Sequence, residues 1–191
     1  YTNSGSLIDY KTDGTAPSAS AVTPATTIID SIHFTNYSFN NWILKNVTGA
    51  QIWAIDSIHG VNSGPCAKVS GYAGTSNVNE DWLISPAINL SSNTDSKLTI
   101  RQAANFVSSQ WEFLQVMISS DYDGTSNPNT QGTWTELTVP TMPSGSNWTF
   151  VDSGDIDISS FDGNAAVYVA FRYRSTSSVA STWEISKVEV K

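Results

Sequence analysis

The chain has 191 residues, enough for one domain with a sizeable core. Only 14% of the residues are charged, against about 25% in ordinary soluble domains, so Ser, Thr, Asn and Gly must supply much of the polar surface. The net charge of −8 argues against binding to nucleic acid or to anionic membrane surfaces, because both require clustered Lys and Arg.

The N-terminal stretch differs in composition from the rest of the chain. From Thr12 onward it is rich in Ser, Thr, Ala and Pro, which bury too little apolar area to offset the entropy lost on ordering. We predict a linker or N-terminal arm over residues 1–27 and one domain over residues 28–191. The longest apolar run, residues 165–171, is far too short for a membrane span. We expect any export signal or lipid anchor to have been removed or to lie outside these residues.

Short apolar or alternating runs, separated by Gly, Pro, Asn and Ser, predict a series of strands. In chain order the runs are 28–29, 32–34, 51–55, 66–69, 79–90, 97–101, 111–118, 133–137, 148–150, 156–158, 166–173 and 183–190. Residues 37–43 predict a loop-rich stretch. Because no sustained helical period occurs, the sequence predicts an all-β fold, an antiparallel jelly-roll β-sandwich.

The run 79–90 is the segment around which we expect the core to form. Trp82 stands at its start and is expected to anchor the core. Pro86 lacks an N–H to donate to a neighbouring strand, so we expect a kink or bulge at Ser85–Pro86.

The last run, 183–190, changes phase. Its apolar residues fall at odd positions up to Ile185 and at even positions from Val188 onward. A bulge near Ser186, or burial of both faces of the strand, would explain the change.

An ordered set of segments resembles a known family. These segments are 60–67, 79–90, 116–121, 133–134, 161–163, 169–173 and 183–185. The set is similar to the choice-of-anchor J domains of Bacteroidetes-type surface proteins, relatives of the cleaved adhesin domain of gingipains. The resemblance covers about residues 28–191 and implies a jelly-roll sandwich, an extracellular setting, and adhesion or glycan binding without catalysis.

The resemblance also implies a calcium ion between the first strand and the last, held by acidic residues from both. Here Ser186 occupies the last-strand position, and only Glu184 and Asp30 remain acidic nearby. Since calcium requires six to eight oxygen ligands, several of them carboxylates, the site is degraded relative to the family's pattern. We predict no metal ligands and no cofactor, with calcium as the alternative. The loop 121–124 resembles the start of a calcium loop but lacks the downstream Glu, so an Asx-turn is the preferred interpretation.

The sequence contains few residues that point to catalysis. Cys66 is the only cysteine and is expected to be a small buried hydrophobe. His33 and His59 lie in no recognisable catalytic context and are expected to be structural or exposed. A glycosidase pair among the acidic residues stays open, because such carboxylates are distant in sequence, but no specific pair is indicated and we predict that the domain is not an enzyme.

Aromatic residues supply the candidate ligand-binding site, because flat rings stack on pyranose faces. Five tryptophans match aromatic positions of the resembled family and are assigned to packing: Trp42, Trp53, Trp82, Trp134 and Trp183. Trp111, Trp148 and Tyr122 lie beside loops and are the predicted binding residues. Arg172 and Arg174 lie on the strand face opposite Val169 and Phe171 and are predicted to supplement them.

The predicted function is that of a non-catalytic extracellular binding module for a neutral glycan or a host polymer. We expect a monomer within a cell-surface protein tethered to the bacterial outer membrane, with no membrane contact by the domain itself. The alternative is a protein-interaction or spacer module of a surface lipoprotein, with a surface or host protein as partner. A glycoside hydrolase or lyase on a jelly roll is the third possibility.

Overall fold

A computed structural model describes residues 30–34 and 38–191, so the predicted linker over residues 1–27 lies outside the described part. The strands are β1 (Asp30–His33), β2 (Ile43–Thr48), β3 (Ala54–Asp56), β4 (Cys66–Ser70), β5 (Asn79–Ile84), β6 (Lys97–Asn105), β7 (Leu114–Ser119), β8 (Thr135–Glu136), β9 (Val151–Asp152), β10 (Ile156–Asp157), β11 (Tyr168–Ser175) and β12 (Thr182–Val190). The described residues form no α-helix, only the short 3-10 turns η2 (Val61–Ser63), η3 (Trp111–Phe113) and η4 (Ser159–Phe161). None of these turns has the length or hydropathy needed to cross a membrane.

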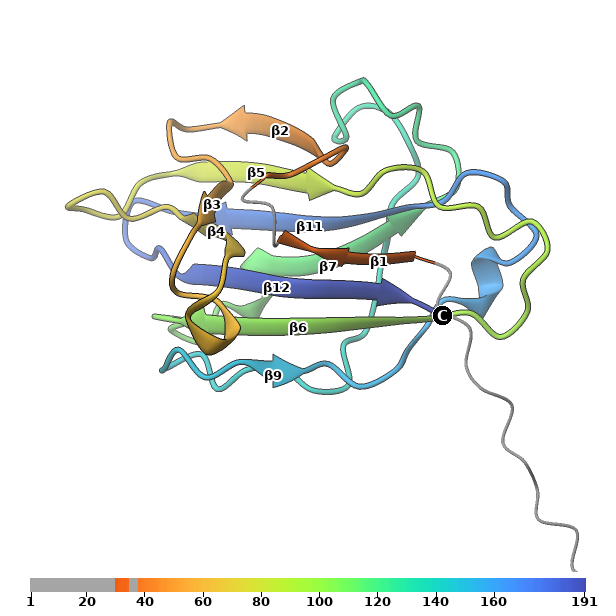
Figure 1. Cartoon of the computed structure of the whole chain (residues 1–191). Coiled ribbons are helices and arrows are strands. Elements are labelled where there is room, and N and C mark those ends of the chain that lie inside the picture. The colour runs from red at the N-terminus through yellow and green to blue at the C-terminus, as the bar shows by residue number, and fades with distance from the viewer. Residues whose placement is uncertain (1–29, 35–37) are drawn as a thin grey trace, which may run out of the picture.

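The strands form two antiparallel sheets that pack face to face (Figure 1). Sheet A has the order β10-β6-β12-β4-β3, with β1 also paired to β12 and β9 to β6. Sheet B has the order β2-β5-β11-β7-β8. The consecutive strands β4, β5, β6 and β7 alternate between the two sheets, as the strands of a jelly roll do. The prediction of an all-β antiparallel sandwich is confirmed.

The main core lies between the sheets and is filled by the inward residues of each strand. In β11 these are Val169, Phe171 and Tyr173, which follow the predicted alternation. Across the core, the rings of Phe171 and Trp183 meet edge to face at 5.5 Å. Trp42, Trp53 and Trp183 are buried in this core, so their assignment to packing is confirmed.

The bulge predicted near Ser186 is confirmed. The register of β12 against β6 shifts between Ile185 and Lys187. Because of this extra residue, Ile185 before the bulge and Val188 after it both face the core. The bulge also marks a change of neighbour on the other edge of β12: β4 pairs with it up to Ile185, and β1 from Lys187.

Trp82 is buried as predicted, but it does not lie in the main core. Leu83 faces the other sheet, so Trp82 points to the outer face of sheet B. There its ring lies 5.1 Å from that of Trp134, which in turn lies 5.2 Å from Tyr122. The loop between β7 and β8 therefore covers a second, smaller apolar cluster on the outer face of sheet B.

Three local predictions differ from the structure. Residues 43–48 form the edge strand β2 of sheet B, although we predicted no strand there. Residues 111–113 form a 3-10 turn, so β7 begins only at Leu114. The run 148–150 has no strand, and the short strand β9 follows it. For β2 the pairing partner is β5, a segment more than 30 residues further along the chain, which a local pattern does not reveal.

Candidate ligand-binding surface

The loops that leave β4, β6 and β11 meet at one end of sheet A and enclose a hollow of about 490 Å³. It lies beside the outer face of that sheet, because its lining includes Ser70 of β4 and Thr182 of β12, whose neighbours Val69 and Trp183 face the core. Hydroxyl groups line it from Ser70, Ser76, Ser108, Ser178 and Thr182. Tyr72, Phe106, Val179 and Ala180 supply its apolar surface, and no charged residue contributes to the lining.

Three aromatic side chains are exposed at this end of the molecule. Tyr72 and Phe106, which line the hollow, are 59% and 62% exposed. Trp148 is 46% exposed, and its ring meets that of Phe106 edge to face at 5.8 Å. Large exposed rings that gather beside one hollow are unusual on a soluble domain, so this end of the molecule is the candidate ligand-binding surface.

The loop that carries Tyr72 is anchored to sheet B. The backbone N–H of Gly71 donates to the hydroxyl of Tyr173 (2.7 Å), and the hydroxyl of Ser175 donates to the carbonyl of Asn77 (2.7 Å). Tyr72 also forms an antiparallel bridge with Ser76. A Cβ on Gly71 would lie 2.0 Å from the Ser175 hydroxyl, so only glycine allows this close approach. The exposed ring of Tyr72 thus stands on a fixed hairpin.

Phe106 has a backbone conformation that is costly for its side chain. Its φ is +61°, in the left-handed region, which a bulky residue rarely adopts and which costs about 1–3 kcal/mol. The side chain of Asn105 supports it by accepting the Phe106 N–H (2.8 Å). An exposed aromatic ring held in a strained conformation points to a functional role more than to a structural one.

A cluster of charged residues lies next to the hollow on the outer face of sheet A. Lys68 pairs with Asp56 (2.9 Å) and with Glu184 (3.5 Å). Burial raises the pKa of Glu184, which is 1% exposed, and the charge of Lys68 opposes that shift. Asp56 also accepts from the ring of His59 (2.7 Å), which is exposed as predicted.

Cys66 is buried as predicted, and burial raises the pKa of its thiol to about 12, so the thiol is inert at neutral pH.

These carboxylates do not form a glycosidase site. Asp56 and Glu184 both pair with Lys68, and neither lines the hollow. The other buried carboxylate, Asp81, shares a face with Leu83 inside the sandwich, in the opposite layer. Two carboxylates, Glu112 and Glu136, do line one cleft together, the one beside β7 and β8.

None of the five predicted binding residues lines the hollow, and only Trp148 lies beside it, through the contact of its ring with that of Phe106. Trp111 is half-buried against the main core and lines a different cleft, of about 540 Å³, beside β7 and β8. Tyr122 is buried in the small cluster on sheet B, and its hydroxyl donates to the carbonyl of Ser126 (2.7 Å).

Arg172 and Arg174 point to the outer face of sheet B, as their position in β11 predicted. Arg172 pairs with Glu80 (2.9 Å) and lies over the ring of Trp82 (5.2 Å). Arg174 donates to the carbonyl of Glu112 (2.5 Å) and lies over the ring of Phe113. Both brace sheet B, whereas the hollow with Trp148 adjoins sheet A, so the structure does not bring the predicted residues together.

Tyr72 and Phe106 are the residues that sequence reasoning missed. Each is a single aromatic in a stretch of small and polar residues between two predicted strands. For Tyr72 that isolation is a usable signal, because its neighbours Gly71 and Ala73 offer little to pack against locally, whereas Phe106 is followed by the apolar Val107 and gives no such signal.

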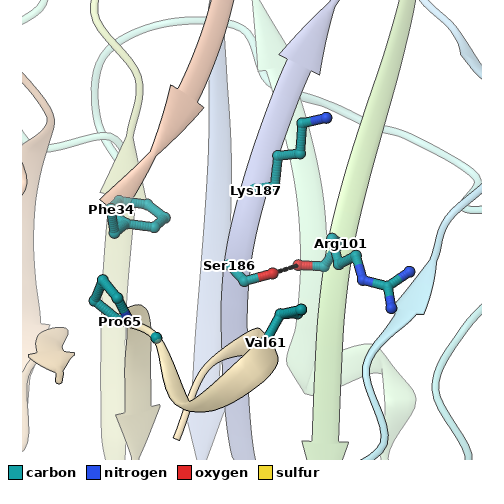
Figure 2. A pocket seen from close by; sticks show the side chains of 7 residues that line it. Phe34, Val61, Pro65, Arg101, Ser186 and Lys187 are labelled. Atoms are coloured by element: carbon teal, nitrogen blue, oxygen red, sulfur yellow. Dashed lines mark hydrogen bonds between the residues drawn. The ribbon is translucent and has the colours of Figure 1, made fainter. Parts of the chain in front are cut away.

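A further hollow, of about 270 Å³, lies where the resemblance places calcium, between β1 and β12 (Figure 2). The described residues that line it include the cations Arg101 and Lys187 and no carboxylate. The Ser186 hydroxyl is used as a donor to the carbonyl of Arg101 (3.3 Å). This set of side chains does not suit Ca²⁺.

The loop 121–124 also offers no open set of oxygen ligands. Asp123 accepts from the backbone N–H groups of Thr125 and Ser126 (both 2.8 Å), which confirms the Asx-turn. Asp121 accepts from Thr133 and from the hydroxyl of Ser119 (2.8 Å). Both carboxylates are held by donors that a metal ion would have to displace.

The fold is that of known adhesin and carbohydrate-binding domains. The K1 cleaved adhesin domain of Lys-gingipain from Porphyromonas gingivalis W83 superposes with a TM-score of 0.56 at 18% identity, over 87% of this chain and 98% of that one. The K3 domain of the same protein gives 0.56 at 14% identity, over 86% and 99%. A Clostridium thermocellum xylanase 10B structure of CBM22-1 and GH10 modules, complexed with xylohexaose, gives 0.53 at 12% identity, over 87% of this chain and 29% of that one. At these identities the likeness establishes the fold alone.

No curated protein matches the chain in sequence. Residues 61–191, from η2 to the last residue, match the family described as Domain of unknown function (DUF5017). The chain therefore belongs to the DUF5017 family.

Proposed function

We propose that this domain is a non-catalytic module that binds a neutral glycan at the hollow formed by the loops after β4, β6 and β11. The observation that carries the proposal is the group of exposed rings, Tyr72, Phe106 and Trp148, beside a hollow lined with hydroxyl groups. Aromatic faces stack on the apolar faces of sugar rings, and hydroxyls exchange hydrogen bonds with sugar hydroxyls.

The chemistry of the lining supports a neutral ligand. The lining of the hollow includes no charged side chain, so an anionic or cationic group entering it would lose solvation without a charged partner. The net charge of −8 repels acidic polysaccharides at long range. Contact through a few rings and hydroxyls supports weak binding, with dissociation constants near the millimolar range.

An extracellular setting is part of this proposal. Its support is the fold shared with gingipain adhesin domains and the low content of charged residues. Within that setting we place the domain among the choice-of-anchor J modules, in a surface protein tethered to the outer membrane.

The test is a screen of neutral glycans followed by calorimetric titration of the best ligand. Phe106→Ala and Trp148→Ala should each weaken binding by about tenfold, since one lost stacking contact is worth about 1.4 kcal/mol. Ile52→Ala is the matched control, because Ile52 is 54% exposed but does not line the hollow. Binding that is unchanged in both aromatic variants would refute the site, and release of shortened sugars would refute the non-catalytic function.

The alternative is a protein-interaction module, and the cleft beside β7 and β8 favours it. That cleft combines apolar residues such as Leu137 and Val139 with the carboxylates of Glu112 and Glu136. Absence of binding to any glycan, together with capture of a defined envelope protein that Leu137→Asp abolishes, would establish this alternative.

A further inference from the structure

Lys68 connects the charged cluster of sheet A to the proposed glycan site. It lies in the middle of β4, where Ala67 and Val69 face the main core, so its side chain points outward. Ser70, two residues further along the same face, lines the hollow. The ammonium of Lys68 lies 5.6 Å from the ring centroid of Trp148, within the distance at which a cation and an aromatic face attract each other.

Two carboxylates fix the position of this ammonium. Asp56 lies 2.9 Å from it and Glu184 lies 3.5 Å from it. Glu184 also stands directly opposite Lys68 in the register of β12 against β4. Because the Glu184 oxygens are buried and accept no hydrogen bond in the described part of the chain, the charge of Lys68 is their main compensation.

Asp56 is itself held in place. Its carboxylate accepts from the backbone N–H of Ile58 (3.2 Å) and of His59 (3.1 Å) as well as from the His59 ring. Burial alone would lower the pKa of Lys68, but the hydrogen bond and charge of Asp56, together with the charge of Glu184, outweigh burial and raise it. Lys68 therefore stays a cation at all pH values near neutrality.

Trp148, in contrast, lies on a segment without regular secondary structure. An Asx-turn fixes its backbone locally, since the N–H of Thr149 donates to the side chain of Asn147 (2.9 Å). Its ring contacts Phe106 on one side and Lys68 on another, and nearly half of it is exposed. Loss of either contact would leave the ring free to adopt other rotamers.

We propose that Lys68 is a positioning residue for the glycan site: held by Asp56 and Glu184, it fixes the ring of Trp148 in the orientation that completes the aromatic surface, without touching the ligand itself. The expected effect of Lys68 on glycan affinity rests on the proposed function. Its effect on the orientation of the Trp148 ring does not, because that orientation can be measured in the ligand-free protein. A pre-oriented ring loses less rotational freedom on binding, so the affinity is higher.

The test uses a double variant, Lys68→Met with Glu184→Gln. Met keeps the length and apolar stem of lysine but removes the charge, and Gln prevents an uncompensated buried carboxylate from unfolding the domain. Lys68→Arg keeps a cation that also stacks on Trp. Lys97→Met with Asp157→Asn is the matched control, because Lys97 pairs with Asp157 at 3.0 Å and its side chain is 30% exposed, as is that of Lys68.

The first readout is the indole N–H resonance of Trp148 in the ligand-free protein, assigned with Trp148→Phe. We expect it to shift or broaden in the Lys68/Glu184 variant and to stay close to its original position in Lys68→Arg and in the control. The second readout is affinity for the glycan, which should fall by about two- to fivefold in the Lys68/Glu184 variant, be restored in Lys68→Arg, and stay unchanged in the control.

An unchanged Trp148 resonance in the Lys68/Glu184 variant would overturn the inference, whether or not the domain binds a glycan. A resonance that moves equally in the Lys97/Asp157 control would also overturn it, since the effect would then be general. A moved resonance in a protein that binds no glycan would uphold the role of Lys68 in orienting the ring and refute the proposed function alone.

Discussion

Asp81 makes the stability of this domain depend on pH in a direction opposite to that of most carboxylates. It is 1% exposed on the inner face of β5, and burial raises its pKa to about 7, with a further rise from the charge of Glu80. Its hydrogen-bond partner is the side-chain amide of Asn79, which opposes the shift. Tyr173 stands opposite Asp81 in the neighbouring strand, but its hydroxyl is already used by Gly71 and Ser181.

The magnitude follows from linkage. In the unfolded chain this carboxyl has its ordinary pKa of 3.8. Between about pH 4 and pH 7 the folded state therefore binds more protons than the unfolded state, and stability falls as pH rises. A difference of about 3 pKa units corresponds to at most about 4 kcal/mol, and about 3 kcal/mol of it should be lost between pH 5 and pH 8.

The perturbation is Asp81→Asn, assayed by urea unfolding at pH 5 and pH 8. The variant should be the more stable protein at pH 8 and should lose this pH dependence. In this variant the side chain at position 81 still accepts from the Asn79 amide, and its own amide can donate to the side-chain oxygen Oδ1 of Asn79, which is buried and has no hydrogen-bond partner among the described residues.

Asp157→Asn is the control. The backbone N–H of Ser159 and the ammonium of Lys97 hold the pKa of the exposed Asp157 below its usual range, so this variant should not be stabilised at pH 8. Two results would show that burial does not raise the pKa of Asp81. One is a free energy of unfolding that changes equally with pH in wild type and in Asp81→Asn. The other is a variant that is less stable than wild type at pH 8.

Three further predictions concern the small cluster, calcium and Phe106. Trp82→Ala should lower stability by about 3–5 kcal/mol, because Trp82 is buried against Trp134, whereas Trp148→Ala should change it by about 0.5 kcal/mol or less; equal melting midpoints for the two variants would contradict this. Calcium added after chelation should give no systematic rise in the melting midpoint, since the residues around Ser186 present cations, and a rise of many degrees below millimolar calcium would reveal a site elsewhere. Phe106→Asn should raise stability by about 1 kcal/mol, because Asn tolerates φ > 0, while glycan affinity falls; a clear loss of stability would show that the Phe106 ring packs rather than binds.

The local sequence pattern was sufficient to predict features that depend on one strand alone and not on its neighbours in the sheet. The alternation in β11 identifies its inward residues, because side chains on a strand alternate between faces whatever the neighbouring strand is. The change of phase in β12 likewise located the bulge at Ser186. β2 escaped prediction because it is an edge strand whose alternating burial is only partial, so its apolar signal is weak.

The binding surface could not be assembled in the same way. Tyr72, Phe106 and Trp148 come from three separate connections of the chain, and only the closing of both sheets brings these loops to one end. The sequence assigned neither Trp148 nor Trp111 to packing, and it could not show that Trp148 stays exposed while Trp111 packs partly against the main core.

By itself, the sequence determined the all-β class, the inward faces of the long strands and the bulge, since each depends on a period of two residues along a single segment. Only the tertiary structure decided which aromatics stay exposed, that Trp82 packs outside the main core, and that Lys68 lies between Glu184 and Trp148. The physical reason is that exposure and charge pairing depend on what a distant segment places on a residue, and that information exists only after the two sheets have packed.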